Sequence, residues 1–226
     1  MMEDHFIQLV DVTKIYHQGD NPVVALDHVH LNISKGEFLA ITGKSGCGKS
    51  TLINIIGGLD SPDRGQVMIT GEDISSMDDR RLTLYRRDRV GIIFQFFNLL
   101  PILSLEENIV LPHLLRKGKS PPAERIEQLL RQMDLHERRH HHPHELSGGE
   151  MQRVAICRAL INDPEIILAD EPTGNLDSAS GKQVLEILRR IREDQGKTIV
   201  LVTHSQEGAA MADRVVRMRD GRLFAE

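Results

Sequence analysis

The segment from Gly43 to Thr51, GKSGCGKST, has the residue types and spacing of a phosphate-binding loop. It follows the apolar run EFLAIT and precedes the apolar run LINIIG, so a strand, a loop and a helix are predicted in succession. Glycines allow the backbone N–H groups at the start of such a helix to face phosphate oxygens. Lys49 would reach the β- and γ-phosphates of a nucleotide, and Ser50 would offer its hydroxyl to Mg²⁺. The expected binding residues are Gly43, Lys44, Ser45, Gly46, Cys47, Gly48, Lys49, Ser50 and Thr51.

Two carboxylates, Asp170 and Glu171, follow the apolar run EIILA. Nucleotides bind at the carboxyl ends of the strands in open α/β sheets, so both side chains are expected near the phosphate-binding loop. Asp170 would hold Mg²⁺ through its water shell, and Glu171 would orient and polarise the water that attacks the γ-phosphate. An acidic pair after a strand is by itself most often a solvated loop, but the phosphate-binding loop upstream favours the catalytic interpretation.

A second glycine-containing loop, LSGGE, places Ser147, Gly148 and Gly149 immediately before a segment of helical period. Such a loop can bind an anion at a helix N-terminus, and it can also be an ordinary N-cap and turn. On these residues alone the N-cap is the favoured interpretation.

The composition limits the classes of protein to which the chain can belong. With 226 residues, 40% of them hydrophobic, it can bury one sizeable core with an inserted subdomain. The net charge of −5 gives no electrostatic reason to bind nucleic acid. No apolar run approaches the roughly 20 residues that cross a bilayer, and the N-terminus lacks the pattern of a signal peptide, so we expect a cytoplasmic protein. Cys47 and Cys157 are expected to be reduced thiols.

The elements that must position these loops are predicted from hydrophobic periodicity. Residues 5–41 alternate as short strands of an antiparallel layer with a turn at HQGDNP, residues 17–22, and GQVMITGEDI adds a hairpin to this layer. The runs RVGIIFQ, EIILADE and TIVLVTH are predicted to be buried strands of a largely parallel sheet. Residues 95–162 have helical period and are interpreted as an insertion between two core strands. Residues 1–94 and 163–226 would then form the β layer and the nucleotide-binding core of a single domain, residues 1–226.

Six motifs occur in an order that resembles the nucleotide-binding domain of ABC transporters. They are GKSGCGKST, Gln95 within IIFQFFNLLP, LSGGE, ILADEP, NLD at Asn175 to Asp177, and TH ending at His204, and they span nearly the whole chain. The resemblance implies an α/β fold, in which a P-loop NTPase (RecA-like) core carries an N-terminal antiparallel β subdomain and an inserted α-helical subdomain. It also implies an enzyme that hydrolyses ATP to ADP and phosphate, coupled to transport.

The same resemblance implies a homodimer that closes head to tail around two Mg-ATP. Ser147, Gly148 and Gly149 of one copy would contact the γ-phosphate bound by the P-loop of the other, and Asp177 would cross the interface. Enclosing the nucleotide would exclude water and surround the developing charge with hydrogen-bond donors.

Three further positions take roles from the family's pattern. Gln95 would contact Mg²⁺ and the attacking water, and His204 would hydrogen-bond the γ-phosphate and complete a catalytic set with Glu171. Tyr16, in the first β layer, would stack on adenine. The expected Mg²⁺ set is Ser50, Gln95 and Asp170. A lone Gln or His after a strand is more often structural, and surface packing is the alternative for Tyr16, so these roles depend on the order of the motifs.

A membrane partner is also implied. The segments VGIIFQFFNLLPILSLEENIVLP, LSGGEMQRVAICRAL and DEPTGNLDS resemble the stand-alone ATPases that serve macrolide efflux, lipoprotein release, antimicrobial-peptide resistance and haem export. In this family a groove after Gln95 receives a short cytoplasmic helix of the permease, and we expect Phe97, Leu99 and Leu100 to contribute to it. The chain would be a peripheral protein on the cytoplasmic face of the inner membrane, in an exporter, and would not bind nucleic acid.

Two other functions share these motifs. A regulatory ABC ATPase would signal through a membrane partner in cell division without moving a substrate. A non-transport ABC ATPase of DNA repair or translation would clamp a nucleic acid. The second class usually carries a long coiled-coil insertion or a second cassette, and 226 residues do not accommodate either.

The tract RRHHHPHE contains four histidines between His140 and His144. Such a tract can collect metal ions, but no cysteine accompanies it and its spacing follows no firm template. A solvated loop is the favoured interpretation.

Overall fold

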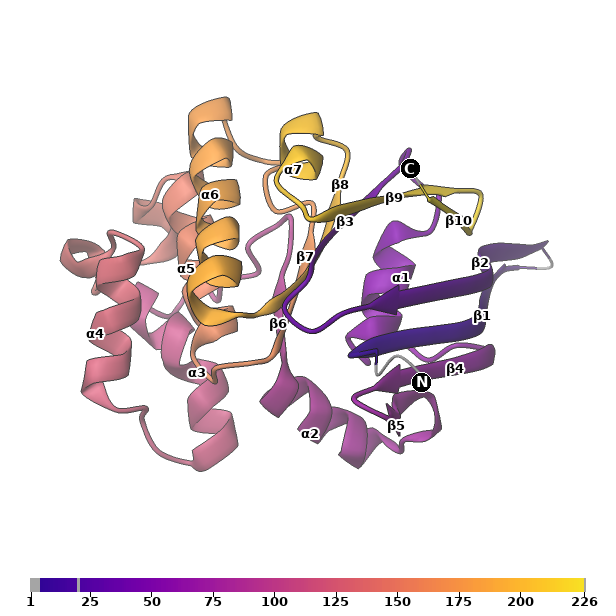
Figure 1. The fold of residues 1–226 in the computed structure, drawn as a ribbon. Coiled ribbons are helices and arrows are strands. Elements are labelled where there is room, and N and C mark those ends of the chain that lie inside the picture. Colours follow the sequence, from indigo (N-terminus) through magenta and orange to yellow (C-terminus); the bar gives the residue numbers. More distant parts are fainter. Residues whose placement is uncertain (1–4, 20, 226) are drawn as a thin grey trace.

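The structure is a computed structural model that describes residues 5–19 and 21–225; residues 1–4, 20 and 226 of the predicted domain lie outside this part. The described chain forms a four-stranded and a six-stranded sheet with helices packed around them (Figure 1). The chain enters through the smaller sheet and ends in the larger one.

The four-stranded sheet is antiparallel. Its strands are β1 (Ile7–Gln18), β2 (Asn21–Ile33), β4 (Arg64–Ile69) and β5 (Glu72–Asp73), in the order β2-β1-β4-β5. β1 and β2 form a hairpin in which pairing reaches from Ile7 with Ile33 to Gln18 with Asn21. The turn predicted over residues 17–22 is therefore too long, because cross-strand pairing satisfies backbone groups that a loop would leave to solvent.

The six-stranded sheet is the core of the molecule. Its strands are β3 (Phe38–Thr42), β6 (Val90–Ile93), β7 (Ile166–Asp170), β8 (Thr198–Thr203), β9 (Arg214–Arg219) and β10 (Arg222–Ala225), in the order β10-β9-β3-β8-β7-β6. All pairs are parallel except β9 with β10. The prediction that placed residues 5–41 in one antiparallel layer is wrong for β3. This strand lies between β8 and β9 with both faces covered, so it is a continuous apolar run and not an alternating one.

Helices cover both faces of the six-stranded sheet (Figure 1). Helix α1 (Lys49–Ile56) lies between the two sheets and contacts β7, β8 and β2. On the opposite face, α5 (Gly148–Leu160) packs on α6 (Ser178–Gln195), and α3 (Leu105–Lys117) packs on α5. The other helices are α2 (Asp79–Arg89), α4 (Ala123–Gln132) and α7 (Gln206–Ala210), with the 3-10 turns η1 (Ile74–Ser76), η2 (His136–Arg138) and η3 (Pro143–Glu145). None of the helices in the described part of the chain has both the length and the apolar character that a bilayer crossing requires.

Alternate residues of the parallel strands point into two separate cores. In β8, Val200 and Val202 belong to the core with α1 and the antiparallel sheet, whereas Ile199 and Leu201 belong to the core with α3, α4, α5 and α6. Helices α3, α4 and α5 lie between β6 and β7 in the sequence, as expected for a helical insertion. The predicted fold class, an α/β P-loop NTPase core with an antiparallel β subdomain and an inserted helical subdomain, is confirmed. The limits 95–162 of that insertion stay a prediction.

Candidate nucleotide-binding and catalytic site

The phosphate-binding loop connects β3 to α1. Gly48, the N-cap of α1, has a φ of 106°, and a Cβ there would lie 2.2 Å from the carbonyl oxygen of Ala25. A Cβ on Gly43 would lie 2.3 Å from the carbonyl oxygen of Met218. Close backbone contact therefore requires glycine at both positions. Within the described residues no side chain caps α1 and its first turn has no acid, so its N–H groups face an anion site.

Lys49 is the first residue of α1, and only 5% of its surface is exposed. Its Nζ donates hydrogen bonds to the carbonyl oxygens of Gly43, at 2.9 Å, and Lys44, at 3.0 Å. The same atom lies 3.9 Å from Oε1 of Glu171. The ammonium group is therefore held over the loop and faces the carboxylate at the end of β7, which is separated from β3 by β8.

Glu171 directly follows β7 and has a φ of 47°, which is uncommon for a residue with a side chain. Its backbone N–H donates to the carbonyl oxygen of Val202 in β8, at 2.9 Å. Its Oε2 lies 2.5 Å from Nδ1 of His204, which follows β8. The structure thus brings Glu171, His204 and Lys49 together at adjacent strand ends, where a carboxylate and an imidazole can hold a water molecule.

Asp170 has the properties of a metal-binding carboxylate. Its burial and the charge of Glu171 raise the pKa of Asp170 more than a hydrogen bond with Ser50 and the charge of Lys49 lower it. Its Oδ1 is buried and has no hydrogen-bond partner among the described residues. Mg²⁺ prefers oxygen ligands, so an unpaired carboxylate oxygen beside a serine hydroxyl fits this ion.

A pocket of about 390 Å³ lies over the loop and these strand ends. Its lining combines the polar phosphate-binding loop with an aromatic ring and two valines, which suits a nucleotide. The predicted residues that line it are Tyr16, Ser45, Gly46, Gly48, Lys49, Ser50, Thr51, Gln95, Asp170 and Glu171. Lys44 and Cys47 line a second cavity beside the loop.

Gln95 reaches the pocket from the segment after β6. Nδ2 of Asn175 donates to the backbone oxygen of Gln95 at 3.0 Å, and the Gln95 side chain lies 3.5 Å from Oδ1 of Asn175. The two predicted motifs that contain these residues therefore meet beside the nucleotide pocket.

Sequence analysis missed two apolar residues of the pocket. Val23 and Val24 line it and are 46% and 47% exposed. The hairpin register pairs Tyr16 with Val23 and Ile15 with Val24. A two-residue turn at residues 19 and 20 would have placed Val23 opposite Tyr16 and Val24 opposite Ile15, so a shorter predicted turn was the signal that could have found them.

The second glycine-containing loop lies outside this pocket. Ser147 is the exposed N-cap of α5, where its hydroxyl accepts from the N–H of Glu150 at 3.2 Å and donates to Oε2 of Glu150 at 2.8 Å. Gly149 is buried, and a Cβ there would lie 2.9 Å from Oγ of Ser180. Asp177 is the exposed N-cap of α6 and accepts from the N–H of Ser180 at 3.0 Å. Among the described residues that line the pocket, none is Ser147, Gly148, Gly149 or Asp177.

The three apolar residues predicted to form a partner groove differ in their surroundings. Leu100 is 44% exposed, Leu99 packs against the helical core, and the carbonyl oxygen of Phe97 accepts from Arg158 at 2.7 Å. A groove of about 580 Å³ opens nearby, but its described lining includes their neighbours Phe94 and Asn98 in place of these three.

The histidine tract lies on the turns before α5. The rings of His142 and His144 stack with their centroids 6.0 Å apart. In residues 5–19 and 21–225, no group of three or more His, Cys, Asp or Glu residues is arranged to hold a metal ion.

Comparison with known proteins gives consistent matches. The family described as ABC transporter matches residues 26–174. An uncharacterized ABC transporter ATP-binding protein, MJ0796 of Methanocaldococcus jannaschii, is 46% identical over 225 residues, which cover 97% of this chain and 96% of the relative. The macrolide export ATP-binding/permease protein MacB of Hyphomonas neptunium is 47% identical over 226 residues. That match covers 100% of this chain, which spans 35% of the length of MacB.

Solved structures agree with these relatives. A dimeric structure of a post-hydrolysis state of the ATP-binding cassette MJ0796, bound to ADP and Pi, has a TM-score of 0.89 and 42% identity, covering 97% of this chain and 98% of that one. The family match includes the phosphate-binding loop, LSGGE and the acidic pair, and the predicted ATPase activity is confirmed. The chain belongs to the ABC transporter family and is an ATP-hydrolysing cassette of it.

Proposed function

We propose that two copies of this cassette enclose two Mg-ATP and drive a separate membrane permease. The observation that carries the proposal is the position of LSGGE: its Ser147 is exposed and lies outside the nucleotide pocket of its own chain. Asp177, which starts the next helix, is exposed as well. Loops that cannot complete their own site can complete that of a second copy, and the related cassette MJ0796 is described as dimeric.

In the proposed site each residue has a separate task. Lys49 binds the γ-phosphate, because its buried ammonium already faces the strand ends. Glu171 orients the attacking water, and His204 keeps that carboxylate in place and contacts the γ-phosphate. Tyr16, which lines the same pocket, stacks on adenine.

Ser50, Asp170 and Gln95 would hold Mg²⁺. When bound, the ion neutralises charge that develops on the phosphates. The buried Oδ1 of Asp170, unpaired within the described chain, supports this assignment, as does the position of Gln95 in the same pocket.

The state of the Glu171→Gln variant in Mg-ATP tests the dimer. Because this variant keeps the phosphate-binding loop and LSGGE but loses the proposed base, it should accumulate as a dimer, measured by light scattering after size exclusion. The same variant in ADP serves as the control and should be monomeric. A variant that binds ATP and remains monomeric at every concentration contradicts the proposal.

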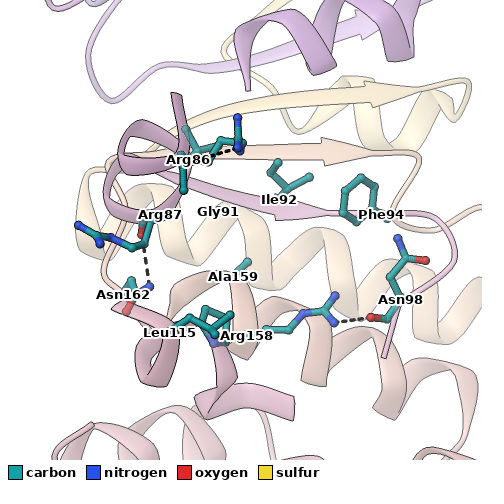
Figure 2. Close-up of a pocket in the computed structure, with 13 residues that line it drawn as sticks. Arg86, Arg87, Gly91, Ile92, Phe94, Asn98, Leu115, Arg158, Ala159 and Asn162 are labelled. Atoms are coloured by element: carbon teal, nitrogen blue, oxygen red, sulfur yellow. Dashed lines mark hydrogen bonds between the residues drawn. The ribbon is translucent and has the colours of Figure 1, made fainter. Parts of the chain in front are cut away.

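The permease would dock in the 580 Å³ groove at the β6 edge of the sheet (Figure 2). Ile92 and Phe94 lie on one wall, and Leu115 and Ala159 lie on the other. Leu115 is 75% exposed, so the groove presents apolar surface to a partner.

The groove is also basic. Arg158 lines it and donates to the backbone oxygens of Phe97 and Asn98. Burial lowers the pKa of Arg158. No carboxylate of the described chain lies within ion-pair distance of this guanidinium, so its charge is balanced only by neutral acceptors.

Arg86, which also lines the groove, likewise donates its hydrogen bonds to neutral acceptors. It donates to the backbone oxygen of Gly58 at 2.7 Å and to the hydroxyl of Thr83 at 3.0 Å, and no carboxylate of the described residues pairs with it. Arg87, in contrast, pairs with Asp88 at 2.8 Å. An apolar groove with two uncompensated cations fits a permease helix that carries apolar side chains and a carboxylate.

Copurification with the membrane protein encoded beside this chain tests the groove. Leu115→Glu places a charge on the exposed wall and should abolish copurification without unfolding the chain. Phe224→Glu is the matched control, because Phe224 is also exposed, at 43%, but lies on β10 at the opposite edge of the sheet. Equal recovery of the permease with both variants would contradict docking of the permease in this groove.

We further propose that the complex is an exporter and that the cassette works at the cytoplasmic face of the membrane. The MacB relative, named as a macrolide export ATP-binding/permease protein, supports this direction. ATP-driven uptake of a substrate into inside-out vesicles tests it. Stimulated ATPase activity without movement of any substrate would favour the regulatory alternative.

A further inference from the structure

The side chain of Asp60 contacts both Tyr16 and Lys14, whose ammonium group lies over the Tyr16 ring. The Tyr16 hydroxyl donates to Oδ2 of Asp60 at 2.7 Å, and Nζ of Lys14 donates to Oδ1 of Asp60 at 2.7 Å. Lys14 also donates to the backbone oxygen of Ser61 at 2.8 Å. Both oxygens of the carboxylate are therefore occupied, one by the phenol and one by the ammonium.

We infer that Asp60 is a positioning residue that fixes the ring of Tyr16 as the adenine platform and ties this platform to the phosphate-binding helix α1. The inference rests on the proposed stacking of adenine on Tyr16. It adds a residue 44 positions away in the sequence that belongs to none of the predicted motifs.

The ring benefits from such an anchor because packing covers it only in part. Tyr16 is 38% exposed and lines the nucleotide pocket. An unrestrained side chain would lose rotamer freedom when a base stacks on it, and a ring fixed in advance avoids that loss. Partial burial opposes ionisation of Asp60, but hydrogen bonds from Lys14 and Tyr16 outweigh it and leave the pKa of Asp60 lowered. Burial and the hydrogen bond to Asp60 raise the pKa of Tyr16, which stays a neutral donor.

The position of Lys14 determines which face of the Tyr16 ring is accessible to a base. Its Nζ lies over the ring at 5.3 Å from the centroid, within the range of a cation–π contact. Neither Lys14 nor Asp60 is among the described residues that line the nucleotide pocket. The ammonium therefore covers one face, and the other face is left for a base.

Asp60 also connects the platform to α1. The N–H groups of Leu59 and Asp60 donate to the backbone oxygen of Asn54, in the last turns of α1, at 2.8 and 3.3 Å. Asp63, three residues later, accepts from the N–H of Ile15 at 2.6 Å and donates its own N–H to Thr13. Residues 59–63 thus join β1, which carries Tyr16, to the helix that begins with Lys49.

Calorimetric titration with ADP and with pyrophosphate separates the base from the phosphates. Asp60→Ala should weaken ADP binding about 5- to 10-fold, within the range of one typical lost hydrogen bond, and leave pyrophosphate binding within about twofold. Tyr16→Phe, which keeps the ring and loses only the hydroxyl, should act in the same direction. Combining Asp60→Ala with Tyr16→Phe should add little, because both remove the same contact.

Asp163→Asn is the matched control. Asp163 pairs with Lys197 at 2.6 Å, and Lys197 is 11% exposed against 12% for Lys14, but this pair is absent from the described lining of the nucleotide pocket. Its backbone φ of 55° suits Asn. ADP binding should be unchanged in this variant.

The Tyr16→Ala variant tests the proposed stacking of adenine on Tyr16 separately from the role of Asp60. This variant should weaken ADP binding about 10- to 100-fold, as expected for loss of base stacking. Unchanged ADP binding in Tyr16→Ala would overturn the platform and the role of Asp60 with it. Weakened binding in Tyr16→Ala with unchanged binding in Asp60→Ala would overturn the role of Asp60 alone. A loss of pyrophosphate affinity in Asp60→Ala equal to the loss for ADP would also overturn it, because the damage would then lie in the phosphate site.

Discussion

Two helices of this cassette begin at a glycine-containing motif, α1 after Gly48 and α5 with Gly148 and Gly149 as its first residues, and their N-termini are capped in opposite ways. Helix α1 starts at Gly48 without a side-chain cap and without an acid in its first turn, within the described chain. Helix α5 starts at Ser147 with a complete capping box that includes Glu150. The first leaves its backbone donors for a ligand, whereas the capping box of the second satisfies the N–H groups of Ser147 and Glu150 within its own chain.

In the proposed dimer, this difference would give the two loops different roles. A phosphate at α1 fills a position that the protein leaves uncapped, so one copy is sufficient to bind a nucleotide. At α5 the hydroxyl of Ser147 is already engaged by Glu150, and contact with a phosphate has to compete with that bond. The LSGGE motif is therefore suited to a late, weaker contact, such as the proposed closing of a dimer.

The largest expected effect separates chemistry from binding on the α1 side. Glu171→Gln should lower kcat about 10²- to 10⁴-fold, the usual contribution of a positioned general base, and leave ADP affinity nearly unchanged. Glu165→Gln is the control, because Glu165 lies at the other end of β7 and pairs with Arg89 at 2.8 Å. Steady-state phosphate release measures both variants. Full activity in Glu171→Gln would show that another group activates the water.

A smaller effect is expected on the α5 side. Ser147→Ala should leave ADP binding to one copy unchanged but weaken the ATP-dependent dimer at least about 10-fold, because it removes a hydrogen bond to a charged phosphate. Titration of the dimer in the Glu171→Gln background by light scattering measures this. The loss of the cap should also lower the free energy of unfolding by about 1 kcal/mol.

Ser104→Ala distinguishes the cap from the contact between copies. Ser104 forms the same capping box with Glu107 at the start of α3. Its removal should have a similar effect on the free energy of unfolding and none on the dimer. If both variants weaken the dimer equally, Ser147 acts only as a helix cap.

The parts of the site that are local in sequence could be predicted. The loop from Gly43 to Thr51 and the pair Asp170 and Glu171 follow from backbone geometry within a few residues, and the structure brings them into one pocket. The role of Ser147 as an N-cap could also be predicted, because Glu150 lies three residues later, as in a capping box.

Contacts between distant segments could not be predicted. β3 was assigned to the wrong sheet, because an apolar run of five residues does not indicate which strands will pair with it. The contact of Asp60 with Tyr16 depends on residues 59–63 folding back onto β1. Hydrophobic periodicity does not indicate such a contact between distant segments. The groove of about 580 Å³ that we propose for the partner is lined by Phe94 and Asn98 of the segment after β6, and the expected contribution of Phe97, Leu99 and Leu100 stays a prediction.

The smallest expected effect concerns the opposite end of α1. Tyr85 of α2 is buried, and its hydroxyl donates to the backbone oxygen of Ile56 at 2.8 Å, so the protein itself satisfies a carbonyl at the C-terminus of this helix. Burial raises the pKa of Tyr85, which keeps the phenol as a donor. Tyr85→Phe keeps the ring and should lower the free energy of unfolding by about 1 kcal/mol, measured by urea denaturation. ADP affinity should not change, because the ligand acts at the N-terminus of α1 and the hydroxyl at its C-terminus. A loss of ADP affinity in Tyr85→Phe would mean that the two ends of α1 are coupled, and that its uncapped N-terminus depends on how its C-terminus is held.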